Sequence, residues 1–198
     1  MKKCTDGGNI EEATEYTYND DGIRVGSFHA KFADGDPVEG SVETTFYLVD
    51  SRNHTGYAQV LEELTYDYAW VDPAPLTDPP TSRKTYTIGD DVITQHEAAA
   101  GPQHLLYDGH GSTRQLSLPE EADNRVEISA LYSYDAYGVM LGGNPTREAP
   151  AATDLLYIGE QFDIDAQQYY LRVRYYDPLN GRFNRADPFA GNQKDLRP

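Results

Sequence analysis

The chain has 198 residues, 16 of them tyrosine, and its 33 acidic against 16 basic residues give a net charge of −17. Such a field repels a nucleic-acid backbone, so we expect no nucleic-acid partner. The single cysteine, Cys4, excludes an internal disulfide framework, and no apolar run is long enough for a membrane-spanning helix.

The first residues, 1–14, are polar and contain glycine, which is typical of a flexible lead-in. The two lysines near Met1 are followed by polar residues instead of an apolar run, so no signal peptide is visible.

Strand-forming and turn-forming residues then alternate over 15–118. In the first unit, Tyr16-Thr17-Tyr18 favours a strand, Asn19-Asp20-Asp21-Gly22 a turn, and Ile23-Arg24-Val25 a second strand. Similar units occupy residues 44–66, 86–96, 105–116, 132–141 and 155–163. A segment with four prolines, 72–83, cannot continue a strand ladder and predicts a loop. The pattern indicates an all-β repeat protein in which no unit buries a face alone.

Residues 169–183 favour a strand, a tight turn at Asp177–Gly181 and a second strand. Strict alternation predicts one apolar face and one aromatic, cationic face on the first strand. The apolar face would hold Tyr169, Leu171, Val173 and Tyr175, and the other face Tyr170, Arg172, Arg174 and Tyr176.

The recurring Tyr-Asp-x-x-Gly units resemble the YD-repeat family, and the block from Leu171 to Pro188 resembles the RHS repeat-associated core domain. By this resemblance, 15–118 are YD-type β repeats, 119–191 are the core domain, and 192–198 are a truncated tail. The residues that carry the turn and core motifs are Asp135, Gly138, Tyr175, Tyr176, Asp177, Pro178, Gly181, Arg182 and Phe183.

The resemblance implies an all-β fold of stacked antiparallel β-hairpins that form a curved, Tyr-rich strip, a segment of an RHS/YD shell. Because the catalytic site that the family would carry is incomplete here, as described below, we expect a non-catalytic role, either encapsulation of a C-terminal cargo such as a toxin or presentation at the cell surface. The expected partners are the rest of its own shell, a cargo, and a cell-surface protein or glycan. The protein would then be secreted or lie at the cell surface.

The resemblance also implies an aspartyl autoprotease that releases the cargo, with Arg174 as supporting arginine and Asp187 as first aspartate. Two neighbouring carboxylates share a proton, so this chemistry needs a second aspartate. The family places it in a later Asp-Pro-x-Gly block, and Asp195 lacks that context. We therefore expect an incomplete site, and autoproteolysis is the alternative function if the natural chain continues.

Several other interpretations of these residues remain open. Exposed rings of Tyr170 and Tyr176 would suit a carbohydrate- or cell-surface-binding module. Arg172 and Arg174 equally suit stacking on rings and pairing with carboxylates, and Asp187 suits the start of a turn.

The remaining polar motifs are more typical of turns than of catalytic or metal-binding sites. Asp108, His110 and Ser112 share one strand parity, as a hydrolytic triad requires, but the glycines between them favour a turn. The sequences around Asn19–Gly22 and Asp34–Asp36 contain oxygen ligands but lack the glutamate that completes a calcium loop. We expect no metal site and no cofactor.

Overall fold

The computed structural model describes residues 2–4, 10–67, 79–119 and 126–187, and its regular structure is almost entirely β. The elements are β1 (Lys2–Cys4), β2 (Ile10–Tyr18), β3 (Arg24–Ala33), β4 (Asp36–Pro37), β5 (Glu43–Asp50), β6 (Gln59–Tyr66), β7 (Ser82–Ile88), β8 (Val92–Glu97), β9 (Gly101–Tyr107), β10 (Thr113–Ser117), β11 (Ile128–Leu131), the 3-10 turn η1 (Tyr157–Gly159), β12 (Gln161–Asp163), β13 (Gln168–Leu171), β14 (Arg174–Asp177) and β15 (Arg182–Phe183).

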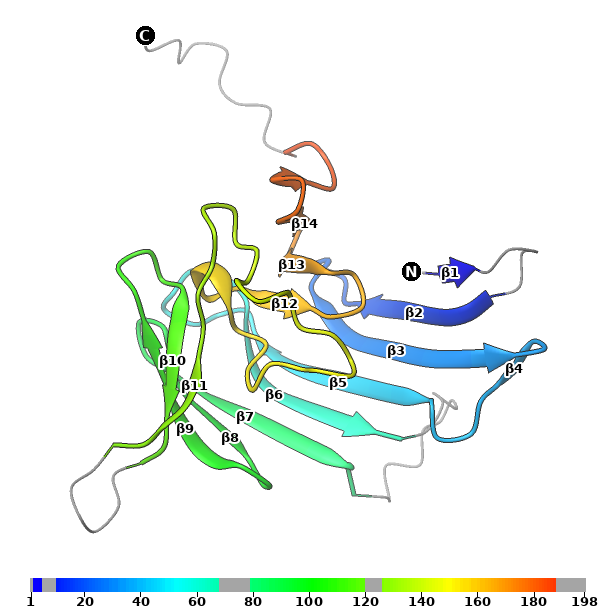
Figure 1. The fold of residues 1–198 in the computed structure, drawn as a ribbon, viewed down its shortest axis with the longest axis horizontal. Helices are drawn as coiled ribbons and strands as arrows, with labels where there is room; N and C mark the ends of the chain where they lie inside the picture. The colour runs from blue at the N-terminus through cyan, green and yellow to red at the C-terminus, as the bar shows by residue number, and fades with distance from the viewer. Residues whose placement is uncertain (1, 5–9, 68–78, 120–125, 188–198) are drawn as a thin grey trace, which may run out of the picture.

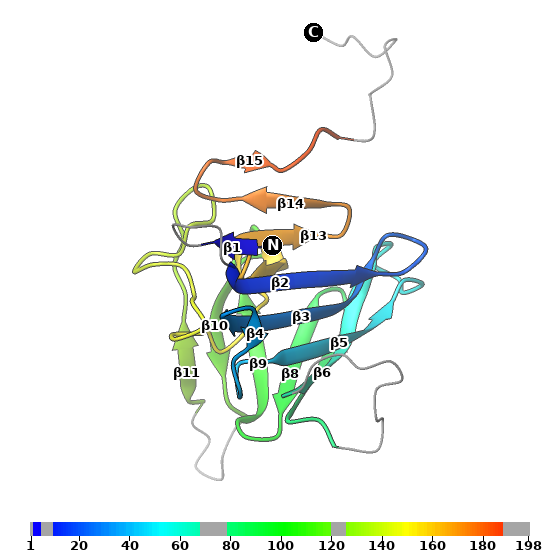
Figure 2. The ribbon, with the colours of Figure 1, turned by 90° about the vertical axis from the view of Figure 1, so that its right-hand side faces the viewer.

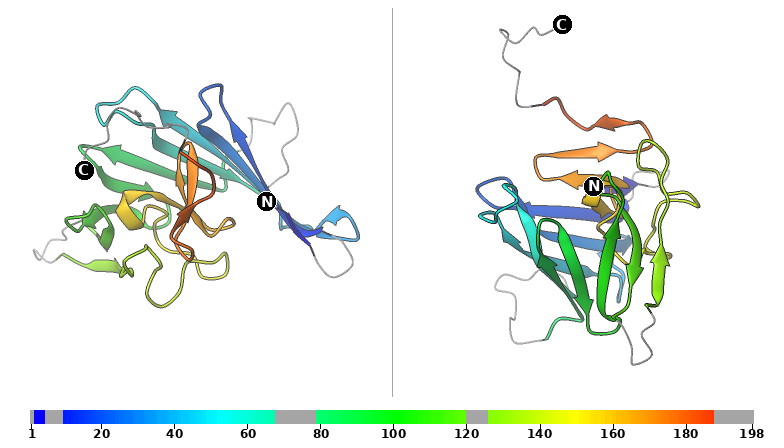
Figure 3. Two further views of the ribbon diagram at one scale, coloured as in Figure 1. Left: turned by 90° about the horizontal axis from the view of Figure 1, so that it is seen from above. Right: turned by 90° about the vertical axis from the view of Figure 1, so that its left-hand side faces the viewer.

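Within the described ranges, β1 to β11 form one antiparallel sheet of eleven strands. Their order follows the chain, with β4 paired to β3 beside the main path. The sheet bends along its length, and β12 with the yellow segment that precedes it lies in its hollow, whereas β14 extends out of it (Figures 1 and 3). We call this sheet the strip. Stacked antiparallel hairpins in a curved strip are the predicted fold, which is confirmed.

A second antiparallel sheet contains β12 to β15, again in chain order. Figure 2 shows β13, β14 and β15 stacked above β2. We call it the small sheet. It meets the inner face of the strip mainly through β12 and β13, which lets residues far apart in the sequence form one interior.

The apolar core lies between the inner face of β7 to β10 and the segment that leads into the small sheet. Leu116 and Leu156 have no exposed surface, and Tyr169 is 1% exposed. Tyrosines form a third of the buried cluster, which consists of Tyr86, Val92, Leu105, Leu116, Tyr132, Leu155, Leu156, Phe162 and Tyr169. Partly polar rings thus provide much of the buried area.

The repeat turns share one hydrogen-bonding pattern. The Oδ1 atom of Asp135 accepts the backbone N–H groups of Tyr137 and Val139, and Gly138 takes a φ of 92°. Asn19 and Asp108 accept the N–H groups two and four residues later in the same way. A side chain that bonds its own turn, followed by glycine in the left-handed region, makes these turns a local property of the sequence.

Three boundaries differ from the sequence-based expectation. Residues 2–4 and 10–14 of the expected lead-in belong to the strands β1 and β2, because β1 pairs with β2 and β2 pairs with β3. β7 begins at Ser82, inside the expected loop 72–83, of which 72–78 lie outside the described residues. β11 pairs with β10, so the strip extends beyond residue 118, where the core domain was expected to start.

Two predicted hairpins also differ. The unit at 132–141 is a turn closed by a single bridge between Tyr134 and Met140, not a pair of strands. The expected strand across 169–176 is itself a hairpin, because Leu171 pairs with Arg174 and Arg172 turns the chain with a φ of 56°. The predicted faces are therefore wrong.

Candidate functional site

The two residues predicted for autoproteolysis lie together at the end of the small sheet. Arg174 Nη1 is 3.0 Å from Asp187 Oδ2, although thirteen positions separate them. The Arg174 guanidinium also lies 3.9 Å from the centroid of the Phe183 ring. Asp187 keeps 52% of its side chain exposed, so this is a partly solvated ion pair on a ring. Among the described residues, Arg174 forms an ion pair with one carboxylate, that of Asp187, whereas acid–base catalysis by aspartates needs two.

The other residues of the core motif build the hairpins around that pair. Asp177 Oδ1 accepts the N–H groups of Leu179 and Asn180, and Gly181 takes a φ of 62°. Pro178 is fully buried, and Arg182 and Phe183 form β15. These residues shape the turn between β14 and β15.

Pairing in the β13–β14 hairpin places the four tyrosines differently from the predicted alternation. Tyr169 is opposite Tyr176, and Tyr170 is opposite Tyr175, so each pair shares a face. Tyr170 is only 6% exposed. It cannot present a ring to a glycan in this structure, which removes half of the aromatic surface expected for carbohydrate binding.

Tyr170 is buried because it covers Arg24, a strip residue that the sequence did not single out. The Arg24 guanidinium lies 4.4 Å from the Tyr170 ring centroid and 4.8 Å from that of Tyr47. Its Nη1 donates to Asp163 at 2.5 Å and its Nη2 to Gln161 at 2.6 Å, both in β12. With 3% of its side chain exposed, Arg24 joins strip and small sheet through a fully paired buried charge.

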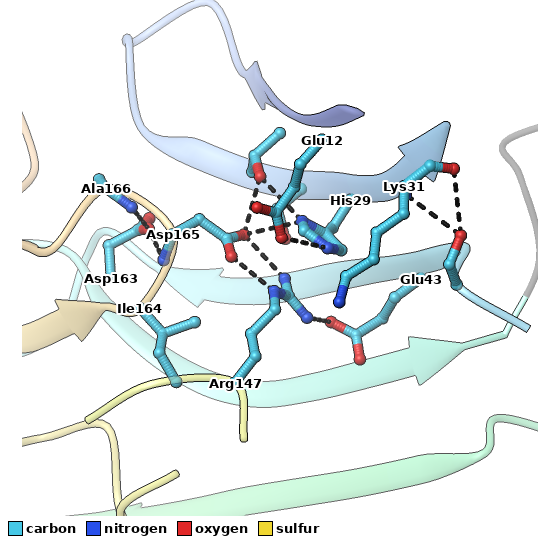
Figure 4. A network of polar contacts seen from close by, with 12 residues as sticks. Glu12, His29, Lys31, Glu43, Arg147, Asp163, Ile164, Asp165 and Ala166 are labelled. Carbon is cyan, nitrogen blue, oxygen red and sulfur yellow. Dashed lines mark hydrogen bonds and ion pairs between the residues drawn. The ribbon is translucent and has the colours of Figure 1, made fainter. Parts of the chain in front are cut away.

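A second polar cluster lies two residues further along, at Asp165 (Figure 4). Arg147 binds both carboxylate oxygens, with Nε 2.5 Å from Oδ1 and Nη2 2.7 Å from Oδ2, and it also reaches Glu43 of β5. His29 Nδ1 is 3.5 Å from Asp165 Oδ2. Burial opposes ionisation, but hydrogen bonds from His29 and Arg147 outweigh it and hold the Asp165 pKa well below its ordinary value.

A third cluster joins β6, β7 and the segment before β12. Lys84 Nζ lies 3.0 Å from Asp154 Oδ2, and Glu63 accepts hydrogen bonds from Tyr86 and Gln161. Burial, followed by the charge of Asp154, raises the pKa of Glu63. All three clusters border one polar cavity of about 200 Å³ between the two sheets.

Sequence reasoning missed these clusters because their members lie far apart along the chain. Arg24 and Asp163 are 139 positions apart, and Lys84 and Asp154 are 70 apart. One available signal was the position of Arg24 at the start of a strand that pairs with the Tyr-containing strand before it, since such charges need partners when buried.

The remaining polar motifs act in turns. Asp108 accepts backbone N–H groups of its own turn, and the buried Ser112 accepts the N–H of Ile158, so neither is oriented as part of a hydrolytic triad. In the part of the chain that the structure describes, no three His, Cys, Asp or Glu side chains are grouped as a metal site would require. Among those residues no helix has the length and hydropathy to cross a membrane.

Comparison with known sequences gives relatives that are named WapA tRNA nucleases. No family model matches the chain. It is 29% identical over 202 aligned residues to the tRNA3(Ser)-specific nuclease WapA of Bacillus spizizenii and to the tRNA nuclease WapA of Bacillus subtilis strain 168. The alignments cover 98% of this chain but only 7% of each relative. The chain thus corresponds to a small part of these proteins.

Comparison with solved structures gives the fold. The crystal structure of TcdB2-TccC3-TEV superposes with a TM-score of 0.59 at 18% identity, and that of TcdB2-TccC3 with 0.52 at 19%. Each match covers 94% of this chain and 8% of the other. Together with the strand order, this likeness supports the fold of stacked antiparallel hairpins in a curved strip.

Proposed function

We propose that this chain is a non-catalytic shell segment of a longer, toxin-related RHS protein, in which the strip encloses a C-terminal cargo. The observation that carries the proposal is the attachment of the small sheet to the hollow face of the strip. Arg24, almost fully buried, pairs with Asp163 and Gln161 across that contact. A strip fastened in this way keeps its curvature, which a container wall requires.

The relatives support the toxin-related part of the proposal, because they are named tRNA nucleases. Since the aligned stretch is 7% of their length, we place a nuclease activity in the cargo and not in this segment. That the segment itself binds no nucleic acid stays a prediction. An electrophoretic mobility assay with total tRNA checks it, and a shift that depends on this segment would contradict it.

The test of encapsulation uses the complete gene product that contains this segment. Limited proteolysis should leave the cargo intact in the parent protein and cleave it after Arg24→Met, which breaks the attachment. Arg83→Met is the matched control, since Arg83 pairs with Glu62 while 63% exposed. Equal cargo cleavage in parent and Arg24→Met protein would argue against a closed wall.

Autoproteolysis is the second candidate, favoured by the Arg174–Asp187 contact of 3.0 Å. Intact mass spectrometry of the complete gene product that contains this segment, after prolonged incubation, separates the two functions. The shell proposal expects no cleavage product. A shorter product that disappears in Asp187→Asn would establish the protease instead.

A further inference from the structure

Glu63 in β6 contacts Gln161, the first residue of the small sheet. Its Oε1 atom accepts a hydrogen bond from Gln161 Nε2 at 3.1 Å and another from the Tyr86 hydroxyl of β7 at 2.8 Å. Gln161 in turn accepts a hydrogen bond from Arg24 at 2.6 Å. Because both bonds to Glu63 end on Oε1, the carboxyl group keeps them whether Oε2 carries a proton or not. Glu63 is therefore a direct polar contact between the strip and the small sheet.

The cations that act on Glu63 are each paired with another carboxylate. Lys84 binds Asp154, and Arg24 binds Asp163. Over the ranges that the structure describes, Glu63 itself forms no ion pair. Six carboxyl groups and three cationic side chains line the cavity between the two sheets, so negative charge is in excess there when all of them are ionised. A partly buried carboxyl group without a cation of its own is stabilised by a proton.

The titratable and charged groups that face Glu63 come from four parts of the chain. They are Arg24 of β3, Tyr47 of β5, Lys84 and Tyr86 of β7, and Asp154 of the segment before β12. Burial and the charge of Asp154 raise the pKa of Glu63, and Lys84, Tyr86 and Arg24 only partly offset this rise. An ionised Glu63 therefore repels the segment that leads into β12.

The polar cavity gives protons a way to Glu63. Glu63 is partly buried and lines that cavity, whose volume is about 200 Å³. A space of this size between polar side chains accommodates several water molecules. A proton can thus leave the carboxyl group and return to it while the two sheets stay folded.

We propose that Glu63 makes the attachment of the small sheet to the strip depend on pH. The small sheet is held closed when Glu63 carries a proton, and it opens locally from the strip when the carboxyl group is ionised. Arginine and lysine keep their charges at neutral pH, so the contacts of Arg24 and Lys84 hold in both states. The attachment is thus tightest in weak acid and loosens as pH rises. The inference concerns the wall itself and does not depend on whether a cargo is enclosed.

Hydrogen–deuterium exchange of the complete gene product that contains this segment, read by mass spectrometry, tests the proposal. Protection factors, corrected for the intrinsic exchange rate at each pH, are compared between peptides covering 160–171 and strip peptides covering 92–107. One proton is released on opening, so protection of 160–171 should fall by up to about tenfold per pH unit. The fall should begin above the ordinary glutamate pKa, about 4.3, and end above the raised value. Protection of 92–107 should stay constant.

Two variants separate Glu63 from the other carboxyl groups. Glu63→Gln keeps an oxygen that accepts both hydrogen bonds but cannot ionise, so protection of 160–171 should no longer depend on pH, and protection of 92–107 shows that the variant is folded. Glu43→Gln is the matched control, because Glu43 lines the same cavity but pairs with Arg147, and it should keep the pH dependence of the parent.

Three results would overturn the proposal: protection of 160–171 that is independent of pH in the parent, an unchanged pH dependence in Glu63→Gln, or a parallel loss of protection at 92–107. Cleavage of the cargo in limited proteolysis is a separate measurement, so failure of the shell function is distinguishable from failure of this inference.

Discussion

The two sides of β12 are held to the strip by different physics. Phe162 points into the apolar core, where it is 4% exposed and contacts the Tyr169 ring at 5.0 Å between centroids. Its neighbours Gln161 and Asp163 point the other way, to Arg24. Because side chains alternate along a strand, Phe162 contacts the apolar core while its two neighbours contact the charged group of Arg24.

The apolar contact mainly determines how strongly β12 is attached, and the charged contact mainly determines in which register it is attached. Apolar burial is non-directional and tolerates small shifts, so the Phe162 side supplies most of the attraction. Charged groups in a buried contact cost free energy unless every partner is in position, so the Arg24 side penalises other registers of β12. The small sheet is thereby both attached and aligned.

The largest effect is expected on the apolar side. Phe162→Ala should lower the free energy of unfolding by about 3–5 kcal/mol, because it leaves a cavity in the core. Urea denaturation measures the change. Leu131→Ala is the matched control, since Leu131 is 71% exposed and should change stability by less than about 0.5 kcal/mol. Equal losses in both variants would refute the assignment of the core.

On the polar side, Arg24→Met should cost about 3 kcal/mol, because it leaves Asp163 buried without its cation. Adding Asp163→Asn should restore part of the loss. A double-mutant cycle by urea denaturation measures the coupling between the two residues. Additive losses would mean that the pair does not align the sheets.

A smaller loss of stability is expected at Gly138, which lies against the Tyr157 ring. A Cβ atom on Gly138 would lie 2.6 Å from the Tyr157 ring, whereas one on Gly142 would meet nothing within 4 Å. Both glycines have positive φ, so both Ala variants carry the same kind of backbone strain. Gly138→Ala should therefore be less stable than Gly142→Ala by about 1–3 kcal/mol in thermal unfolding. Similar melting temperatures would show that the ring moves aside freely.

The pH dependence of stability reports on two carboxyl groups of the polar side, Glu63 and Asp165. Between the unfolded pKa of Glu63, about 4.3, and its raised folded value, the folded chain binds more protons, so stability falls as pH rises. The depressed Asp165 pKa stabilises the fold above about pH 3.9, and this contribution is lost as pH falls toward the folded value. We expect a stability maximum in weak acid.

Urea denaturation at a series of pH values measures this profile. Glu63→Gln should flatten the decline on the neutral side without moving the acid side. Arg147→Met should move the acid side instead, because Arg147 is one of the groups that lower the Asp165 pKa. A profile that both variants leave unchanged would contradict the assignment.

The smallest loss of stability is expected at Arg174 and Asp187, which lie outside both the apolar core and the charged contact at Arg24. Asp187→Asn should change the free energy of unfolding by less than about 1 kcal/mol, because a partly solvated ion pair contributes little. Urea denaturation at low and high salt measures it. A loss comparable to that of Arg24→Met would show that this pair supports the fold.

The turns were predictable from the sequence because their chemistry is local. Asn19, Asp108 and Asp135 each bond backbone N–H groups within four residues, and the glycine that follows supplies the positive φ. The hairpin at Arg172 was not predictable in this way, since arginine rarely turns a chain in the left-handed region. Its guanidinium is held by Glu160 and by the Tyr57 ring 4.5 Å away, partners that alternation in one strand does not reveal.

The sequence alone determined the β class, the repeated hairpins and the positions of most turns, because these depend on residues within a few positions of each other. It also drew attention to Arg174 and Asp187, which the fold brings together. Only the tertiary structure decided which charges pair across the two sheets: Arg24 meets Asp163 and Lys84 meets Asp154 because β12 and the segment before it lie in the hollow of the strip (Figure 1). Burial and charge pairing depend on residues that lie far apart in the chain, and no local pattern encodes them.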